Sequence, residues 1–250
     1  MAYARGGSLH KNLNLVAQLE WNDKLKLLHS IVSDLQIIHS HELIHRDLHS
    51  GNILLDDICN AYIADLGLSL SVKEDSNGIY GILAYVDPEV LNGKPYTTAS
   101  DIYSFGIIMW EILYGRPVSY DLEDQSMLQI EICFNNLRPT IIGNVPQHYI
   151  NLMKGCWEKE SKKRPTADKI CEIFTEWQSN EKILLELSVS KVTIENFKYT
   201  HEIKSLETYT RSKYISKSKS YSQEMDNTDN ELVIEIGSGW TPPGSSQINK

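Results

Sequence analysis

Apolar side chains recur at helical spacing in several stretches of the chain, and these stretches predict its main helices. In the first, Asn22 can cap a helix to about residue 40, with leucine, isoleucine and valine returning every three or four positions. The same spacing follows Pro146 and, further on, Thr166. The methionine and tryptophan side chains of these stretches fit the apolar stripes, so we expect them in the core.

Residues 100–114 have a different pattern, because apolar side chains occupy almost every side of the predicted helix. The run stops at Gly115, and glycine is the residue that most often terminates a helix. A helix that is apolar all round is normally enclosed by other elements. We therefore expect residues 100–114 to form the hydrophobic axis of the fold.

Two short apolar runs, at 53–55 and 61–64, flank a polar stretch at 56–60. Runs of this length around turn residues predict a β-hairpin. The hairpin would bring together Asn52, just before its first strand, and Asp65, just after its second.

The polar residues around the predicted hairpin form an extended motif. Residues 45–52 read His-Arg-Asp-Leu-His-Ser-Gly-Asn, and Asp-Leu-Gly follows at 65–67. The motif resembles the catalytic loop and the metal-binding segment of protein kinases, H-R-D-L-x-x-x-N and D-F-G. Phosphoryl transfer depends on positioning and charge neutralisation more than on covalent chemistry, which explains the acids and the amide.

The resemblance implies a role for each of these side chains. Asp47 would receive the proton of the substrate hydroxyl, in a catalytic group that also contains Arg46, His49 and Asn52. Asn52 and Asp65 would hold Mg²⁺ on ATP, the two implied cofactors. Because Arg46 precedes the catalytic acid, phosphate in the activation segment is an expected control, with candidates at Ser69, Ser71, Ser76 and Tyr80.

The first nine residues, Met-Ala-Tyr-Ala-Arg-Gly-Gly-Ser-Leu, resemble the hinge between the two lobes of a kinase. The backbone of Ala2 and Ala4 would then face adenine, with Leu54 as the apolar floor below it. The glycine-rich loop and the strand lysine of the family precede the hinge, so we expect the N-terminal lobe to be missing here. Without the N-terminal lobe the nucleotide would be contacted from one side only. We therefore expect the chain alone to be a poor kinase.

Four further residues would have structural roles by the same resemblance. His45 opens the catalytic-loop motif, and Asp101 would tie that loop to the predicted axial helix. The sequence Lys-Arg-Pro-Thr at 163–166 matches the end of tyrosine-kinase and tyrosine-kinase-like domains, where the arginine pairs with the glutamate after the activation segment. That ion pair would join Arg164 to Glu89.

These expectations define a mainly α (α+β) fold: a protein-kinase C-terminal lobe with a small β-hairpin at the catalytic cleft. The kinase domain would span 1–180, followed over 181–250 by a short helical extension and a disordered tail. From Tyr199 the chain is poor in apolar residues, which favours disorder. Basic and then acidic stretches leave two interpretations of the tail open, a docking segment and a plain solvated end.

Composition and charge narrow the class of protein. The formal net charge is -9, which gives no support for nucleic acid as the main ligand. The 4 cysteines are scattered, without the spacing of a zinc site or a disulfide framework. With no apolar signal segment and no run of transmembrane length, we expect a cytoplasmic protein.

Several positions depart from the kinase pattern. His49 stands where serine/threonine kinases usually have a lysine near the transferred phosphate, so that contact should be weaker or lost at neutral pH. Leu66, Ile82 and Asp87 replace phenylalanine, threonine and alanine of the family. These departures leave the choice of acceptor, Ser/Thr or Tyr, open, although the motifs most resemble the tyrosine-kinase-like group.

Two functions are therefore carried forward. The first is a protein kinase that transfers the γ-phosphate of ATP to hydroxyls of a protein substrate, with the absent lobe needed for full activity. The alternative is a non-catalytic kinase-like binding or scaffold module. A metal cluster of His39, His41, His45 and His49 is disfavoured, because the catalytic-loop motif accounts for His45 and a helix end would aim the others apart.

Overall fold

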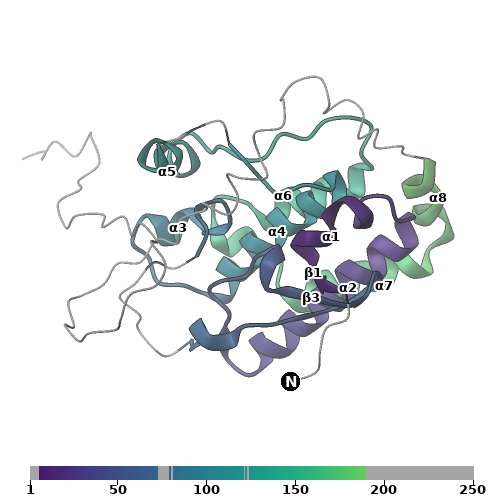
Figure 1. Cartoon of the computed structure of the whole chain (residues 1–250), viewed down its shortest axis with the longest axis horizontal. Coiled ribbons are helices and arrows are strands. Elements are labelled where there is room, and N and C mark those ends of the chain that lie inside the picture. The colour runs from purple at the N-terminus through teal and green to yellow at the C-terminus, as the bar shows by residue number, and fades with distance from the viewer. Residues whose placement is uncertain (1–5, 73–78, 80, 121, 123, 190–250) are drawn as a thin grey trace, which may run out of the picture.

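A computed structural model describes residues 6–72, 79, 81–120, 122 and 124–189 of the chain. Within these ranges the protein is mainly helical, with two small antiparallel sheets on one side (Figure 1). No helix of the described residues is long and apolar enough to cross a membrane. The predicted disordered tail at 199–250 lies outside the described residues.

Helix α4, Thr98–Tyr114, is the axis of the core, as the apolar pattern predicted. All its residues from Ser100 onward are buried. It begins two residues earlier than expected because the side chains of Thr97 and Ser100 form a reciprocal cap. It ends at Gly115, whose φ of 70° and closeness to Ala17, 2.7 Å from an added Cβ, both require glycine.

Three more helices confirm the helical periods: α2 (Trp21–Ser40), α6 (Gln147–Cys156) and α7 (Ala167–Ser179). Asn22 was predicted to cap α2, but this was wrong, because the helix already begins at Trp21 with Glu20 at the cap position. The indole of Trp21 is buried and packs edge-on against Tyr149 at 5.2 Å, which explains why the helix extends to include it. Helix α8, Glu181–Val189, is the expected extension.

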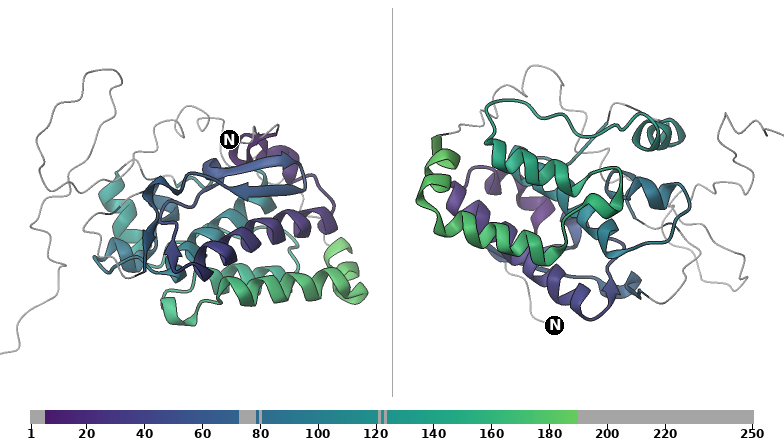
Figure 2. Two further views of the ribbon diagram at one scale, coloured as in Figure 1. Left: turned by 90° about the horizontal axis from the view of Figure 1, so that it is seen from below. Right: turned by 180° about the vertical axis from the view of Figure 1, so that it is seen from behind.

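The predicted hairpin consists of strands β3 (Ile53–Asp57) and β4 (Asn60–Ile63), paired antiparallel. Strand β1, Gly7–Ser8, adds a third strand beside β3, and β2 (Leu43–Ile44) pairs with β5 (Leu70–Ser71) in a separate sheet. The left view of Figure 2 shows the hairpin lying over α2, with α7 on the opposite side of that helix. The hairpin is therefore supported by the helical core.

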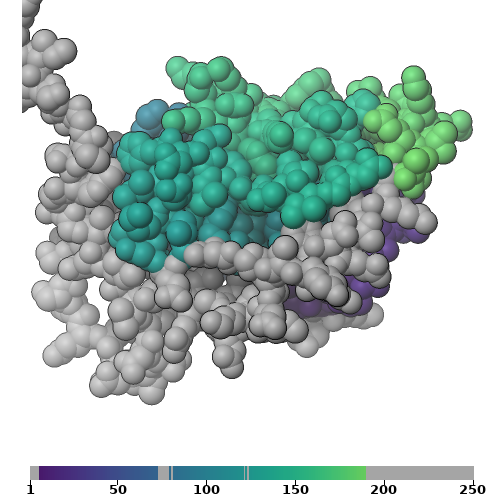
Figure 3. All heavy atoms as spheres, turned by 90° about the horizontal axis from the view of Figure 1, so that it is seen from above, coloured from purple at the N-terminus to yellow at the C-terminus, as the bar shows by residue number. Residues whose placement is uncertain are grey.

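The remaining elements surround α4. Helix α1, Leu9–Val16, precedes α2, and the short helix α3, Pro88–Leu91, shares a second small apolar cluster with α5, Gln125–Cys133. Figure 3 shows α5 and the teal segment after it covering one face of the molecule, with α8 at one end. Short 3-10 turns occur at Ser50–Asn52, Leu66–Leu68, Leu83–Tyr85 and Ser161–Lys163.

Candidate active site

The carboxylate of Asp101 fixes the start of the 45–52 loop. It is buried and accepts the backbone N–H of His45 on Oδ2 and that of Arg46 on Oδ1, both at 2.9 Å. His39 Nε2 donates to Oδ2 at 2.8 Å. The three donors hold Arg46 in a left-handed conformation, φ 72°, against the rigid axial helix. This is the link between loop and helix that the resemblance implied for Asp101.

The imidazole of His45 joins the loop to the end of the hairpin. Its Nε2 lies 3.0 Å from the carbonyl oxygen of Ala64, which can only accept, so Nε2 carries the proton. Nδ1 is then the acceptor for the backbone N–H of Asp47, at 3.3 Å. The fully buried ring therefore fixes the position of the 45–52 loop relative to the end of strand β4.

Asp47 and Asn52 lie side by side. Asn52 Nδ2 donates to the carbonyl oxygen of Asp47 at 2.9 Å and to its carboxylate Oδ2 at 3.3 Å. The other oxygen of Asp47, Oδ1, is buried and has no hydrogen-bond partner among the described residues. Burial raises the pKa of Asp47, opposed by nearby His45 and by the Asn52 hydrogen bond. A buried acceptor left open in this way is typical of a functional group.

Asp65 reaches the same point from the second strand of the hairpin. The backbone N–H of Ala64 donates to the carbonyl oxygen of Asn52 at 2.8 Å, so the two segments are adjacent. Asp65 adopts a left-handed conformation, φ 61°, and its Oδ1 accepts the N–H of Gly67 at 3.3 Å while the side chain is exposed. The hairpin thus brings Asn52 and Asp65 together, as predicted.

The side-chain oxygen atoms of Asn52 and Asp65 are suitable ligands for a magnesium ion. Asn52 uses its amide nitrogen on Asp47, which leaves the amide oxygen without a partner in the described part of the chain. Asp65 has one carboxylate oxygen engaged by Gly67 and one open to solvent. Hard oxygen ligands of this kind suit Mg²⁺, which usually keeps several waters. Asn52 and Asp65 are therefore chemically suited to hold the ion that the motif implied.

His49 is buried beside Asp47 and cannot act as a cation at neutral pH. Burial lowers the pKa of His49 to about 4, with further lowering by His45 and His10. Its Nδ1 accepts the backbone N–H of Gly51 at 3.0 Å, and Nε2 lies 3.8 Å from Asp47 Oδ2. A neutral imidazole lacks the positive charge that a lysine would carry at this position.

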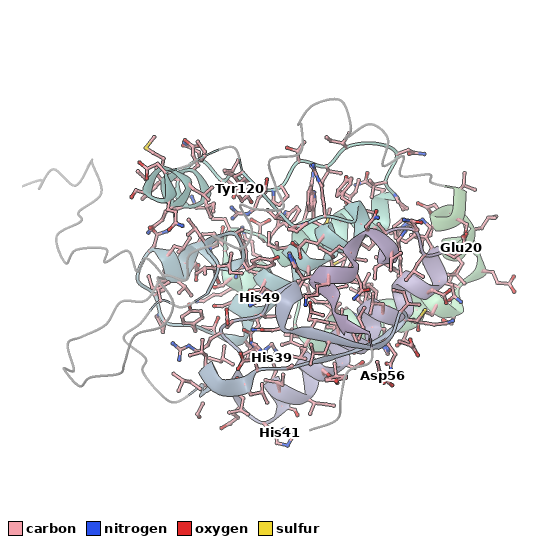
Figure 4. The ribbon with its side chains drawn as sticks, in the orientation of Figure 1. Glu20, His39, His41, His49, Asp56 and Tyr120 are labelled. Carbon is pink, nitrogen blue, oxygen red and sulfur yellow. The ribbon has the colours of Figure 1, made fainter. Side chains whose placement is uncertain are left out.

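The other histidines of this stretch point in different directions. Figure 4 shows His41 at the outer edge of the molecule, whereas His49 lies toward the interior. His41 Nδ1 lies 2.8 Å from the carbonyl oxygen of Ile37, and His39 binds Asp101. Across the described residues, no group of three or more His, Cys, Asp or Glu side chains could hold a metal ion.

The side chain of Arg46 contacts the segment after Asp65, which the resemblance identifies as the activation segment. Its Nη1 donates to the carbonyl oxygen of Leu68 at 3.3 Å, and its guanidinium lies 4.9 Å from the centre of the Tyr96 ring. Two of the four candidate phosphorylation sites, Ser69 and Ser71, are described residues near Leu68, whereas Ser76 and Tyr80 lie outside the described ranges.

The predicted ion pair between Arg164 and Glu89 was wrong, because Arg164 binds Asp87. Arg164 Nη2 donates to Asp87 Oδ1 at 2.9 Å and Nη1 donates to Oδ2, with both side chains buried. Asp87 also caps α3 by accepting the N–H of Glu89 at 2.9 Å, which turns its carboxylate inward. Glu89 lies two residues later and is partly exposed. Its carboxylate accepts the hydroxyl of Ser161 at 2.8 Å and forms an ion pair with Lys94 at 3.1 Å.

Glu111, the second acid of the axial helix after Asp101, was not predicted from the sequence. It is fully buried, accepts the hydroxyl of Tyr85 at 2.6 Å and the N–H of Val118 at 3.0 Å, and burial raises its pKa to about 7. Oγ of Ser50, in the 45–52 loop, lies 3.3 Å from the Tyr85 hydroxyl. A lone acid in the largely apolar stretch 105–114 was the signal that could have identified this network.

The predicted nucleotide-side residues are only partly described. Leu54 is half-buried on β3, opposite Ser8 on one side and Tyr62 on the other. This position, on the hairpin that carries Asn52 and Asp65, is compatible with a floor for adenine. Ala2 and Ala4 lie outside the described residues.

Comparisons with known proteins agree with this geometry. The sequence model of the family protein tyrosine and serine/threonine kinase matches residues 1–174. In Dictyostelium discoideum, cyclic GMP-binding protein C is 39% identical over 192 residues, 70% of this chain and 7% of that protein. A probable serine/threonine-protein kinase is 33% identical over 168 residues, and the dual specificity protein kinase pyk3 is 32% identical over 199.

The matched region is a small part of each relative. It covers 66% of this chain and 10% of the probable serine/threonine-protein kinase, and 78% of this chain and 14% of pyk3. The family match spans more than half of the chain and includes the whole 45–67 site. The chain belongs to the protein tyrosine and serine/threonine kinase family.

Proposed function

We propose that this chain is the catalytic part of an ATP- and Mg²⁺-dependent protein kinase that phosphorylates Ser or Thr hydroxyls of proteins. The observation that carries the proposal is the open, buried Oδ1 of Asp47, held beside Asn52 while Asp65 arrives from the next strand. A group that aligns a hydroxyl next to a magnesium site is what phosphoryl transfer requires. The names of the relatives, serine/threonine and dual specificity kinases, support hydroxyl acceptors.

In this proposal, each side chain acts through an atom that the geometry leaves available. Asp47 accepts the acceptor hydroxyl's proton on Oδ1. Asn52 and Asp65 hold magnesium, which neutralises phosphate charge when bound. Leu54 supports adenine from below. The backbone of Ala2 and Ala4, which lie outside the described residues, would bind the edge of adenine by the resemblance alone.

We further propose that residues 1–180 act as the C-terminal lobe of the kinase domain and that 181–250 form an extension with a solvated or docking tail. The 250 residues contain no glycine-rich phosphate loop followed by a strand lysine, so those parts must come from outside them for efficient transfer. A cytoplasmic location agrees with the scattered cysteines.

The decisive experiment adds the nucleotide side of the site. The chain is fused behind an N-terminal lobe from its upstream reading frame or from a close relative, and phosphorylation of a generic protein acceptor is measured. We expect magnesium-dependent transfer by the fusion, whereas the chain alone binds ATP more weakly than roughly 100 μM by calorimetry. Asp47→Asn in the fusion should lower kcat by at least about 10²-fold.

A kinase-like binding module is the second candidate, favoured by the neutral imidazole of His49 in place of a cation. A fusion that folds and binds ATP but transfers no phosphate would give this alternative first place. Activity that survives Asp47→Asn would also remove the proposed base. If no phosphate is transferred, the intact domain would serve as a docking surface.

A further inference from the structure

The imidazole ring of His49 is locked in one orientation. Its Nδ1 accepts the backbone N–H of Gly51 at 3.0 Å, so in the neutral ring the proton resides on Nε2. An added Cβ at Gly51 would lie 2.6 Å from His49 Cε1, so only glycine leaves room for the ring. The ring is buried and lies 5.9 Å, centroid to centroid, from Tyr85. His49 therefore presents an N–H in a fixed direction.

The Nε2 atom of His49 lies close to one oxygen of Asp47. Nε2 lies 3.8 Å from Oδ2, the oxygen to which Asn52 Nδ2 donates at 3.3 Å. No described residue donates to Oδ1, and an added Cβ at Gly81 would lie 3.1 Å from it. The 3.8 Å separation exceeds a direct hydrogen bond, but catalytic contacts are often long without substrate and shorten when it binds.

We propose that His49 is a positioning residue for Asp47: its neutral ring donates from Nε2 to Oδ2 and thereby reserves Oδ1 for the substrate hydroxyl. The proposal deepens the proposed kinase function and rests on it for the role of Oδ1. Two donors on one carboxylate oxygen, from His49 and Asn52, fix the rotation of the carboxylate about its terminal bond. A carboxylate held on one side has a single oxygen available for the acceptor.

This role differs from that of a lysine at the same position. A lysine places a flexible cation near the transferred phosphate, whereas the buried imidazole is neutral and oriented toward the base. The two residues therefore differ in charge and also in the group that they contact, phosphate for a lysine and Asp47 for His49. His49 acts on the reaction through Asp47, while the phosphate side of the site relies on magnesium.

Two substitutions separate this role from a purely structural one. His49→Asn keeps an acceptor in the place of Nδ1 for the Gly51 N–H but loses the donor toward Asp47. His49→Gln is long enough to bring an amide N–H to the place of Nε2 but loses the Gly51 contact. If His49 positions Asp47, the His49→Gln variant should resemble the parent. If the ring only caps the loop through Gly51, the His49→Asn variant should resemble the parent instead.

The first readout is NMR of the full 250-residue chain, with ¹⁵N-labelled histidine and ¹³C-labelled aspartate. We expect His49 to be protonated on Nε2 alone, and the Asp47 carboxyl resonance to move in His49→Asn and to stay near the parent position in His49→Gln. Protonation on Nδ1, or an Asp47 resonance that follows the opposite ranking or ignores both substitutions, would overturn the proposal. Melting curves identify any variant that fails to fold, and the tautomer of the parent then still decides.

The second readout is kinetic, in the fusion described above. His49→Asn should lower kcat about tenfold with the KM for the protein acceptor unchanged, and His49→Gln should stay within about twofold of the parent. A loss of kcat that is equal in both variants would contradict the positioning role. If the parent fusion transfers no phosphate, the kinase proposal fails, whereas the NMR result still tests whether His49 orients Asp47.

Discussion

Two buried carboxylates of this protein, Asp87 and Asp47, have opposite environments. Asp87 is 1% exposed and both of its oxygens bind the guanidinium of Arg164, which also donates to the carbonyl oxygens of Ala99 and Glu158. Asp47 is 6% exposed, receives Asn52 on one oxygen and has no partner among the described residues on the other. The two groups have nearly equal burial but very different hydrogen bonding.

The comparison separates a carboxylate whose charge is fully compensated within the fold from one that is left partly uncompensated, at the position of the proposed catalytic base. A bidentate arginine compensates the loss of hydration of Asp87 and joins the segment before α3 to the segment before α7. Burial without full compensation raises the pKa of Asp47. Such an arrangement costs stability and is expected where a reactive group must stay accessible to a substrate.

The largest loss of stability should come from breaking the buried ion pair between Arg164 and Asp87. Arg164→Ala would leave Asp87 buried without its cation, which typically costs about 3–5 kcal/mol of unfolding free energy. We expect the variant to unfold or aggregate, as measured by urea denaturation and by solubility. Lys163→Ala removes the neighbouring exposed pair with Glu160 and should leave the melting temperature unchanged.

The same measurement distinguishes the two acids near Arg164. Asp87→Asn should destabilise strongly, whereas Glu89→Gln should have little effect, because Glu89 is 25% exposed and binds Ser161 and Lys94. A Glu89→Gln variant as unstable as Asp87→Asn would show that the ion pair is shared between both acids.

The next effect concerns Glu111, a third buried carboxyl with one oxygen satisfied and the other without a partner among the described residues. Its pKa is raised from 4.5 to about 7, so the folded protein keeps the proton between these values while the unfolded chain loses it. Its contribution to stability is present below pH 4.5 and falls by about 1.4 kcal/mol per pH unit up to pH 7. The total is about 3 kcal/mol.

Glu111→Gln tests this dependence because glutamine keeps the shape and cannot ionise. Urea denaturation at a series of pH values should show the parent losing stability relative to the variant from pH 5 to 7, with no further divergence above. A constant difference over this range would mean that Glu111 does not carry a proton in the folded state. Glu89→Gln, at the surface, is the matched control.

The smallest change in unfolding free energy should come from Asp47, whose Oδ1 has no partner among the described residues. Its replacement should stabilise the protein, whereas Asp87→Asn should destabilise it. Asp47→Asn removes a charge whose folded-state pKa is raised, so it should stabilise the lobe at pH 8 by about 0.5–2 kcal/mol. The gain should vanish as the pH falls below the ordinary value of 3.8, where both states are protonated. A variant that is less stable at pH 8 would show that Asp47 is compensated by contacts like those of Asp87.

Much of the fold follows from local patterns. Helices α2, α4, α6 and α7 and the β3–β4 hairpin were predictable, because spacing and turn residues act over a few positions. Strand β1 and the pairing of β2 with β5 were not predicted, since strands of two residues have too little pattern to detect. The start of α2 at Trp21 depended on a contact with Tyr149, far away in sequence.

By itself the sequence determined the catalytic loop, its Asn52 and Asp65 neighbours and the axial helix, because motif spacing and a hairpin of fixed length bring these groups together. Only the tertiary structure decided which acid faces Arg164, which nitrogen of His49 carries the proton and which oxygen of Asp47 stays open. These outcomes depend on the direction in which a side chain leaves the backbone and on what is packed across from it. Neighbouring residues such as Asp87 and Glu89 thus acquire opposite roles through burial and hydrogen bonding, which act across distances that a sequence pattern does not record.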